Sequence, residues 1–161
     1  MDNTNALYDA SRRNNIEEVK RLIADGDTNV NPEKSPIGVA AADGNVAIVE
    51  ILIDAGIDIN QGDNGRFTPL SLAILNRRTE IAKMLIDAGA DVNKANSAGR
   101  TPLFWARKEG NTEIVDLLLE NGAIEGVARG ARKKTKARKS RGKLRKTRKS
   151  NKKSRKSYKR K

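Results

Sequence analysis

The sequence has no cysteine, no histidine and few aromatic residues, which make up only 3% of its 161 residues. The two absences exclude disulfides, thiol nucleophiles, imidazole bases and the usual zinc-ligand sets. They also fit a reducing compartment. Catalysis would then require a lysine–carboxylate or metal site, and no cluster of residues suggests one. We therefore expect a protein that is not an enzyme and that has no cofactor or metal site.

Long apolar runs are also absent. No run approaches the roughly 20 residues that a membrane-spanning helix needs. The opening residues, Met1-Asp2-Asn3-Thr4-Asn5, lack the basic and then apolar character of a secretory signal. We expect a soluble, intracellular protein without a membrane span.

Charge divides the chain into two parts. Residues 1–125 hold 13 Lys/Arg against 20 Asp/Glu, a net charge of −7. Residues 126–161 hold 20 Lys/Arg and no acid, a net charge of +20. A domain of residues 1–125 and a separate basic tail of residues 126–161 are therefore predicted.

What the sequence does contain is a repeat of 33 residues. Ser35-Pro36, Thr68-Pro69 and Thr101-Pro102 keep this interval, as do two series of single residues, Leu52, Leu85, Leu118 and Gly56, Gly89, Gly122. A fixed period of this size indicates one supersecondary unit stacked on copies of itself. Each Ser/Thr-Pro pair predicts a helix start, and each glycine predicts a left-handed helix end after a second, amphipathic helix.

Two phrases of the third copy, Thr68-Pro69-Leu70-Ser71-Leu72-Ala73 and Ala88-Gly89-Ala90-Asp91-Val92-Asn93, closely resemble the ankyrin repeat. The resemblance covers about residues 5–125 and implies an all-α solenoid of stacked helix–turn–helix units with hairpin loops. It also implies that a protein partner binds at the hairpin tips and on the concave, inner-helix face. Because Asp58 and Asp91 belong to the closing phrase, their spacing is interpreted as structural.

The copies differ in ways that predict their positions. We expect a degenerate cap at about residues 5–31 and repeats at 32–64, 65–97 and 98–125. In the first copy Glu18 and Arg21 replace apolar residues, which is typical of an N-terminal cap. Arg107 indicates a C-terminal cap in the last copy, although Ile114 and Leu117 remain apolar there. Arg77 replaces the glycine of other copies, so its turn must differ or be strained.

Candidate partner-binding residues lie in the predicted hairpins and at the ends of the inner helices. Phe67 is the first choice, because a large apolar loop residue is often an interface anchor; the alternative is packing onto the neighbouring hairpin. Trp105 replaces a leucine of the repeat and is predicted to lie in the core. The full set is Asn64, Arg66, Phe67, Leu75, Asn76, Ser97, Arg100, Lys108 and Glu109.

The tail has too few apolar residues to fold alone and is predicted to be disordered when free. Its cations predict sequence-independent nucleic-acid association, recognition by a nuclear import receptor, or both, so the nucleus is favoured over the cytoplasm. Ser/Thr residues recur after basic pairs, which suggests control by phosphorylation; the alternative is that these residues are merely common in disordered basic segments. The predicted polyanion-binding set is Arg132, Lys133, Lys134, Lys136, Arg138, Lys139, Arg141, Lys143, Arg145, Lys146, Arg148, Lys149, Lys152, Lys153, Arg155 and Lys156.

The predicted function is therefore that of a monomeric, non-enzymatic adaptor. Its repeats would bind a protein whose identity the sequence does not specify, and its tail would bind nucleic acid or direct the chain to the nucleus. The alternative is a repeat-only interaction protein whose tail is just a localisation signal or folds back on the acidic repeats as an autoinhibitory arm. Both interpretations are compatible with a cellular or a viral origin.

Overall fold

Ser–Pro and Thr–Pro pairs begin three helices in the computed structural model, which describes residues 5–26 and 33–124. These helices are α3 (Pro36–Asp43), α5 (Pro69–Leu75) and α7 (Pro102–Lys108), each with proline in its first turn. In each, the side-chain hydroxyl of the Ser or Thr before the proline accepts a hydrogen bond from a backbone amide that has no partner within the helix, as predicted. The bonds join Gly38 N to Ser35 Oγ (3.0 Å), Ser71 N to Thr68 Oγ1 (3.2 Å) and Phe104 N to Thr101 Oγ1 (3.4 Å).

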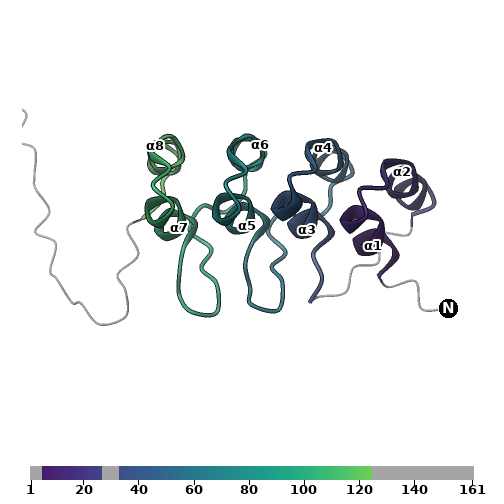
Figure 1. Ribbon diagram of the computed structural model, residues 1–161, viewed down its shortest axis with the longest axis horizontal. Coiled ribbons are helices and arrows are strands. Elements are labelled where there is room, and N and C mark those ends of the chain that lie inside the picture. Colours follow the sequence, from purple (N-terminus) through teal and green to yellow (C-terminus); the bar gives the residue numbers. More distant parts are fainter. Residues whose placement is uncertain (1–4, 27–32, 125–161) are drawn as a thin grey trace, which may run out of the picture. The chain divides into compact units, whose positions relative to one another are not determined.

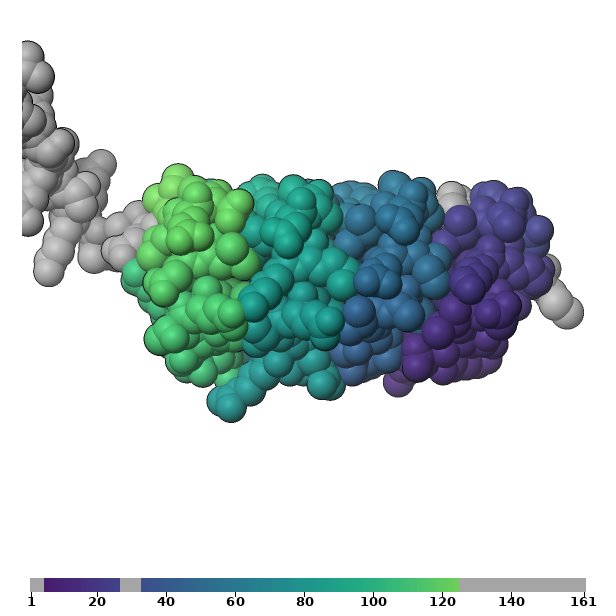
Figure 2. All heavy atoms as spheres, turned by 90° about the horizontal axis from the view of Figure 1, so that it is seen from above, coloured from purple at the N-terminus to yellow at the C-terminus, as the bar shows by residue number. Residues whose placement is uncertain are grey.

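The helices of the described residues form four pairs that stack in a row (Figure 1). The first helices of the pairs, α1 (Ala6–Arg12), α3, α5 and α7, make an inner layer. The second helices make an outer layer: α2 (Ile16–Ala24), α4 (Val46–Asp54), α6 (Thr79–Asp87) and α8 (Thr112–Glu120). Figure 2 shows the four pairs as successive bands. No strand occurs in these residues, so the prediction of an all-α stack is confirmed.

The core lies between the two layers and is built from equivalent positions of successive repeats. Leu52, Leu85 and Leu118 are completely buried, as are the inner-layer alanines 40, 73 and 106. Small side chains at the alanine positions let neighbouring inner helices approach closely, and each buried leucine contributes about 1.5–3 kcal/mol. The 33-residue period is therefore the period of the core.

The loops between repeats are joined to one another through asparagine. Asn60 Oδ1 accepts a hydrogen bond from Asp91 N at 2.8 Å, and Asn93 Oδ1 accepts one from Ile124 N at 2.7 Å. Within the loops, the Asp58 carboxylate accepts a hydrogen bond from the backbone amide of Asn60, and the Asp91 carboxylate accepts one from that of Asn93. Both acids thus shape loops, which agrees with the structural interpretation of their spacing.

Two arginines occupy left-handed backbone positions that glycine holds in other repeats. Arg77, in the turn between α5 and α6, has φ +58°, whereas Gly44 and Gly110 have φ +92° and +69°. Arg66 also has φ +58° in its hairpin, and Gly99, at the equivalent position of the next hairpin, has φ +73°. The turn at Arg77 therefore keeps the geometry of its relatives and is strained, because a Cβ disfavours this conformation.

Arg66→Gly is expected to raise the free energy of unfolding by about 0.5–1 kcal/mol, because glycine adopts the left-handed backbone conformation of this exposed site without the strain that a Cβ causes. The midpoint of thermal unfolding should then rise by about 2–4 °C. The reverse change in the next hairpin, Gly99→Arg, is the matched control and should lower the midpoint. A lower midpoint in Arg66→Gly would show that the arginine side chain stabilises the loop.

The first repeat has a polar outer helix, as the prediction of an N-terminal cap requires. Glu18 stands where α4 has buried Ile48, and Arg21 donates two hydrogen bonds to it, at 2.6 and 2.9 Å. Arg21 also donates to Asp25 at 3.0 Å. The hydrogen bonds from Arg21 lower the pKa of Glu18 and raise that of the guanidinium. This end of the stack therefore carries an ion-pair network in place of apolar residues.

The lowered pKa of Glu18 makes this network sensitive to acid. Its stabilising contribution is present above the usual carboxyl pKa and is lost as pH falls through the lowered folded-state value. Glu18→Gln should therefore reduce the urea midpoint slightly at neutral pH and leave it unchanged at about pH 2. Glu17→Gln, on the same helix, is the control; an equal loss at both pH values would contradict an ionic origin.

Candidate functional site

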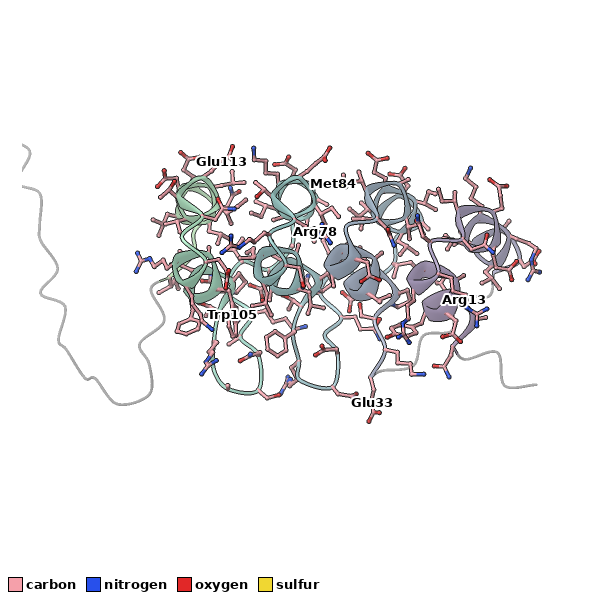
Figure 3. The ribbon with its side chains drawn as sticks, viewed as in Figure 1. Arg13, Glu33, Arg78, Met84, Trp105 and Glu113 are labelled. Carbon is pink, nitrogen blue, oxygen red and sulfur yellow. The ribbon has the colours of Figure 1, made fainter. Side chains whose placement is uncertain are left out.

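An aromatic cluster lies where α7 meets the preceding hairpin loop. Trp105 is 4% exposed and lies on the hairpin-loop side of α7 (Figure 3). The Phe67 ring packs against it with 5.7 Å between centroids, and Phe104 meets it edge-on at 5.1 Å. Such tilted and T-shaped contacts between rings are favourable beyond the area that they bury. The prediction that Trp105 is a core residue is thus confirmed.

Two cations cover this cluster. The Arg100 guanidinium lies 5.2 Å from the Phe104 centroid and 5.3 Å from that of Trp105, and Lys108 Nζ lies 5.1 Å from Trp105. Both cationic residues are exposed. Cation–π contacts hold such charges over the rings without neutralising them. We name Phe67, Arg100, Phe104, Trp105 and Lys108 the aromatic–cationic cluster.

The hairpin-tip candidates lie together on neighbouring tips. Asn64 and Arg66 are exposed on one tip, and Ser97 is exposed on the next. Ser97 donates from both N and Oγ to the Gly65 carbonyl, at 3.0 and 2.9 Å, so the two tips are fixed relative to each other. Phe67 is half-buried and packs on Trp105 of the next repeat, so of its two predicted roles packing is observed, although onto a helix and not a hairpin, and partner binding stays a prediction.

The inner-helix candidates are less available, with one exception. Leu75 is half-buried against the core, and Asn76 donates its side-chain amide to the Leu72 carbonyl at 2.8 Å. Glu109 accepts from Arg77 at 3.2 Å and its side chain is only 18% exposed. Lys108 alone presents its charge next to the hairpins, in the aromatic–cationic cluster.

Sequence reasoning missed Phe104. Its side chain is 44% exposed, whereas the equivalent Ser71 is fully buried and Gly38 has no side chain. A large apolar residue at a position that is small in the second and third repeats was the available signal. The composition of the inner helices alone did not distinguish Phe104, which is exposed, from the buried apolar residues of the same helix.

The outer helices carry charge of the opposite sign. Helices α4, α6 and α8 hold one base, Lys83, which pairs with Glu113, and seven acids: Glu50, Asp54, Glu80, Asp87, Glu113, Asp116 and Glu120. Two open grooves lie between these helices, of about 260 and 380 Å³. The first is lined partly by Ile53 and Met84, and the second mainly by acids. The hairpin side and the outer side of the stack therefore differ in electrostatic character.

Among the described residues, these acids are spread over separate grooves and loops. Asp54 and Asp87 line separate grooves, and Asp58 and Asp91 lie in the loops. Across residues 5–26 and 33–124, no three carboxylates are placed to hold a metal ion. The same ranges contain no helix with the length and apolar character of a membrane span. The predicted tail cations, Arg132 to Lys156, lie outside the described residues, and their binding stays a prediction.

Comparison with known proteins agrees with this arrangement. A family model described as ankyrin repeats (3 copies) matches residues 7–96 and, in a second match, residues 63–129. Mitochondrial disaggregase from Bos taurus is 40% identical over 62 residues, which cover 37% of this chain and 9% of that protein. The match thus spans less than a tenth of that relative. Ankyrin repeats are in general protein–protein interaction modules and are typically non-enzymatic. This chain belongs to the ankyrin-repeat family.

Proposed function

We propose that the protein is a non-enzymatic adaptor whose third and fourth repeats bind a carboxylate-bearing segment of a protein partner. The observation that carries this proposal is the aromatic–cationic cluster beside two hairpin tips held in a fixed relation. Rings with cations over them suit a segment that combines an apolar group with acidic residues. The basic tail would bring the bound partner to nucleic acid or into the nucleus.

The electrostatics of the hairpin side support an acidic partner. Asp63 lies in the same hairpin as Phe67, and its Oδ1 accepts hydrogen bonds from the amides of Gly65 and Phe67 at 2.9 Å each. Glu109, at the end of α7, is engaged by Arg77. Arg100 and Lys108 are thus not paired with these acids, and complementary charge favours both encounter and specificity.

Random-peptide display against the full chain tests this proposal. Selected peptides should be rich in Asp and Glu. Their dissociation constants should rise about five- to thirtyfold with Arg100→Ala and Lys108→Ala together, since each cation–π or charged contact contributes about 0.5–1 kcal/mol.

The outer face provides the matched control. Glu50→Gln and Asp116→Asn also change two exposed charges, yet they should leave peptide binding within about twofold, since they lie on the opposite layer. Peptides that are basic, or that lose affinity only with the outer-face pair, would contradict binding at the aromatic–cationic cluster.

The tail proposal rests on composition. Residues 126–161 carry 20 cations and no acid, which is an average spacing close enough to follow a phosphate backbone. The cations would bind phosphates and position the chain without specifying a base sequence. The alternative, a tail that acts only as a localisation signal, predicts no functional binding by purified protein.

A further inference from the structure

The outer helices of the last three repeats each present an aliphatic and an acidic side chain at equivalent positions. The aliphatic residues are half-buried and lie one on each of α4, α6 and α8: Ile51, Met84 and Leu117. The acids are exposed and follow them by three residues: Asp54, Asp87 and Glu120. Because residues three apart lie on the same face of a helix, the two side chains of each helix are neighbours. We name these six residues the outer paired surface.

The charges of the three acids are not balanced locally. Asp54, Asp87 and Glu120 form no ion pair with any of residues 5–26 and 33–124. Each is the last residue of its helix, and none of these helices has a base in its last turn. The partial negative charge at a helix C-terminus disfavours an acid there and favours a cation. A cation supplied from outside the outer layer would therefore interact favourably with both the carboxylates and the helix ends.

The aliphatic side chains are accessible through the two outer grooves. Met84 lines the groove between α4 and α6, and Leu117 lines the groove between α6 and α8. Figure 3 shows Met84 on the outer layer. The surface does not extend to α2, where Arg21 and Ala24 stand at the same distances before the glycine that follows the helix. The last three repeats alone thus combine grooves that are partly apolar with unpaired acids.

We propose that the outer paired surface binds a basic amphipathic helix of a partner protein. Charge complementarity and the apolar groove residues together support this occupant, because an amphipathic helix lays its apolar face into a groove and can pair its cations at the rim. Packed helices lie about 8–10 Å apart, which corresponds to about six or seven residues of a helix that rises 1.5 Å per residue. Apolar and basic residues that recur every two turns of the bound helix would therefore contact successive repeats.

The basic tail of this chain is the other candidate occupant, and its composition disfavours it. Apart from a few alanines, the apolar residues of the tail are Val127, Leu144 and Tyr158. Its cations could pair with the acids, but these few apolar side chains do not recur as the groove residues do. The site is also independent of the aromatic–cationic cluster, which lies on the hairpin side. The adaptor would thus bind an acidic segment on one side and a basic helix on the other.

Fluorescence anisotropy of labelled synthetic peptides with the full chain tests the proposal. The probe is a peptide of lysine and leucine whose leucines fall on one face of a helix. In one control peptide serine replaces leucine, and in the other glutamate replaces lysine. At about 0.15 M salt the lysine–leucine peptide should bind at least about tenfold more tightly than either control, because only this peptide matches both the acids and the grooves.

Variants locate the binding. Asp54→Asn, Asp87→Asn and Glu120→Gln together should raise the dissociation constant of the lysine–leucine peptide at least about threefold, the modest effect expected of exposed ion pairs. Their thermal midpoint should stay the same or rise, because acids at helix C-termini are unfavourable, so unfolding would not explain lost binding. Asp43→Asn is the matched control, since Asp43 is the last residue of inner helix α3, and it should leave binding unchanged.

Met84→Gln keeps the length of the side chain and tests the apolar part of the surface. It should weaken binding of the lysine–leucine peptide and leave the lysine–serine peptide unaffected, with folding verified by circular dichroism. Arg100→Ala with Lys108→Ala should change neither, so failure of this site is distinguishable from failure of the aromatic–cationic cluster.

Three results would overturn the proposal. The first is no binding of the lysine–leucine peptide up to about 0.5 mM. The second is an equal loss of affinity in Asp43→Asn and in the variant of the three outer acids. The third is equal binding of the lysine–serine peptide, or binding of the lysine–leucine peptide that tightens about tenfold when glutamine replaces the cations from Arg132 to Lys156. Either form of the third result would assign the outer paired surface to the tail.

Discussion

Trp105→Ala is expected to lower the free energy of unfolding by about 3–5 kcal/mol, the usual loss for truncating a buried tryptophan. The side chain is 4% exposed and contacts Phe67 of the preceding loop, so its removal opens a cavity between the third and fourth repeats. Stability in a stacked array depends on such nearest-neighbour interfaces. Urea unfolding followed by far-ultraviolet circular dichroism measures the change. Tryptophan fluorescence cannot follow it, because Trp105 is the only tryptophan and the variant lacks it.

Two control variants separate packing from hydrogen bonding at this site. Trp105→Leu installs the residue of the equivalent Leu72 and should cost less than Trp105→Ala, because it leaves a smaller cavity. The buried Trp105 Nε1 has no hydrogen-bond acceptor among the described residues. Trp105→Phe removes this unsatisfied donor, which offsets part of the lost packing, since an unpaired buried donor costs about 1–3 kcal/mol. Equal losses in all three variants would contradict this account.

Much of the fold follows from local chemistry that recurs in sequence. A hydroxyl next to proline can satisfy an orphan amide and start a helix with no help from distant residues. The positions of α3, α5 and α7 were therefore predictable. The strained turn at Arg77 was also predictable, because the 33-residue register places it at the glycine of the neighbouring turns. Local rules apply equally to every copy.

Exposure was harder to predict, because it depends on which neighbour covers each position. Phe67 stands in a loop, where the sequence left both an interface anchor and packing onto the neighbouring hairpin open, and only the structure shows that Trp105 of the next repeat packs against it. Arg107 indicated a polar C-terminal end, yet exposed Phe104 and Leu119 leave that end partly apolar. Periodicity identifies equivalent positions but does not show whether a further repeat covers them. The aromatic–cationic cluster was equally hard to predict, because it brings Arg100 of a hairpin loop over the rings of Phe104 and Trp105 on α7.

The full chain is expected to bind duplex DNA and RNA with a steep dependence on salt. If ten of the 20 tail cations neutralise phosphates, the logarithm of the binding constant falls with the logarithm of salt with a slope of about −9. Affinity should then drop by about 10⁵-fold between 50 and 200 mM salt. Two duplexes of unrelated sequence should bind equally, because contacts to phosphate carry no sequence information. Fluorescence anisotropy across a salt series measures both quantities.

A variant that replaces the 16 cations from Arg132 to Lys156 with glutamine is the matched control, because it keeps the chain length and all residues of the repeats. It should lose most of the affinity and most of the slope, since at most four tail cations remain. Replacing the Ser/Thr residues that follow basic pairs with glutamate should reduce the slope in proportion to the added negative charge. Equally weak binding by wild type and by the neutralised variant would contradict nucleic-acid association. It would favour a localisation signal or an autoinhibitory arm, and protein binding by the repeats would then be the whole function.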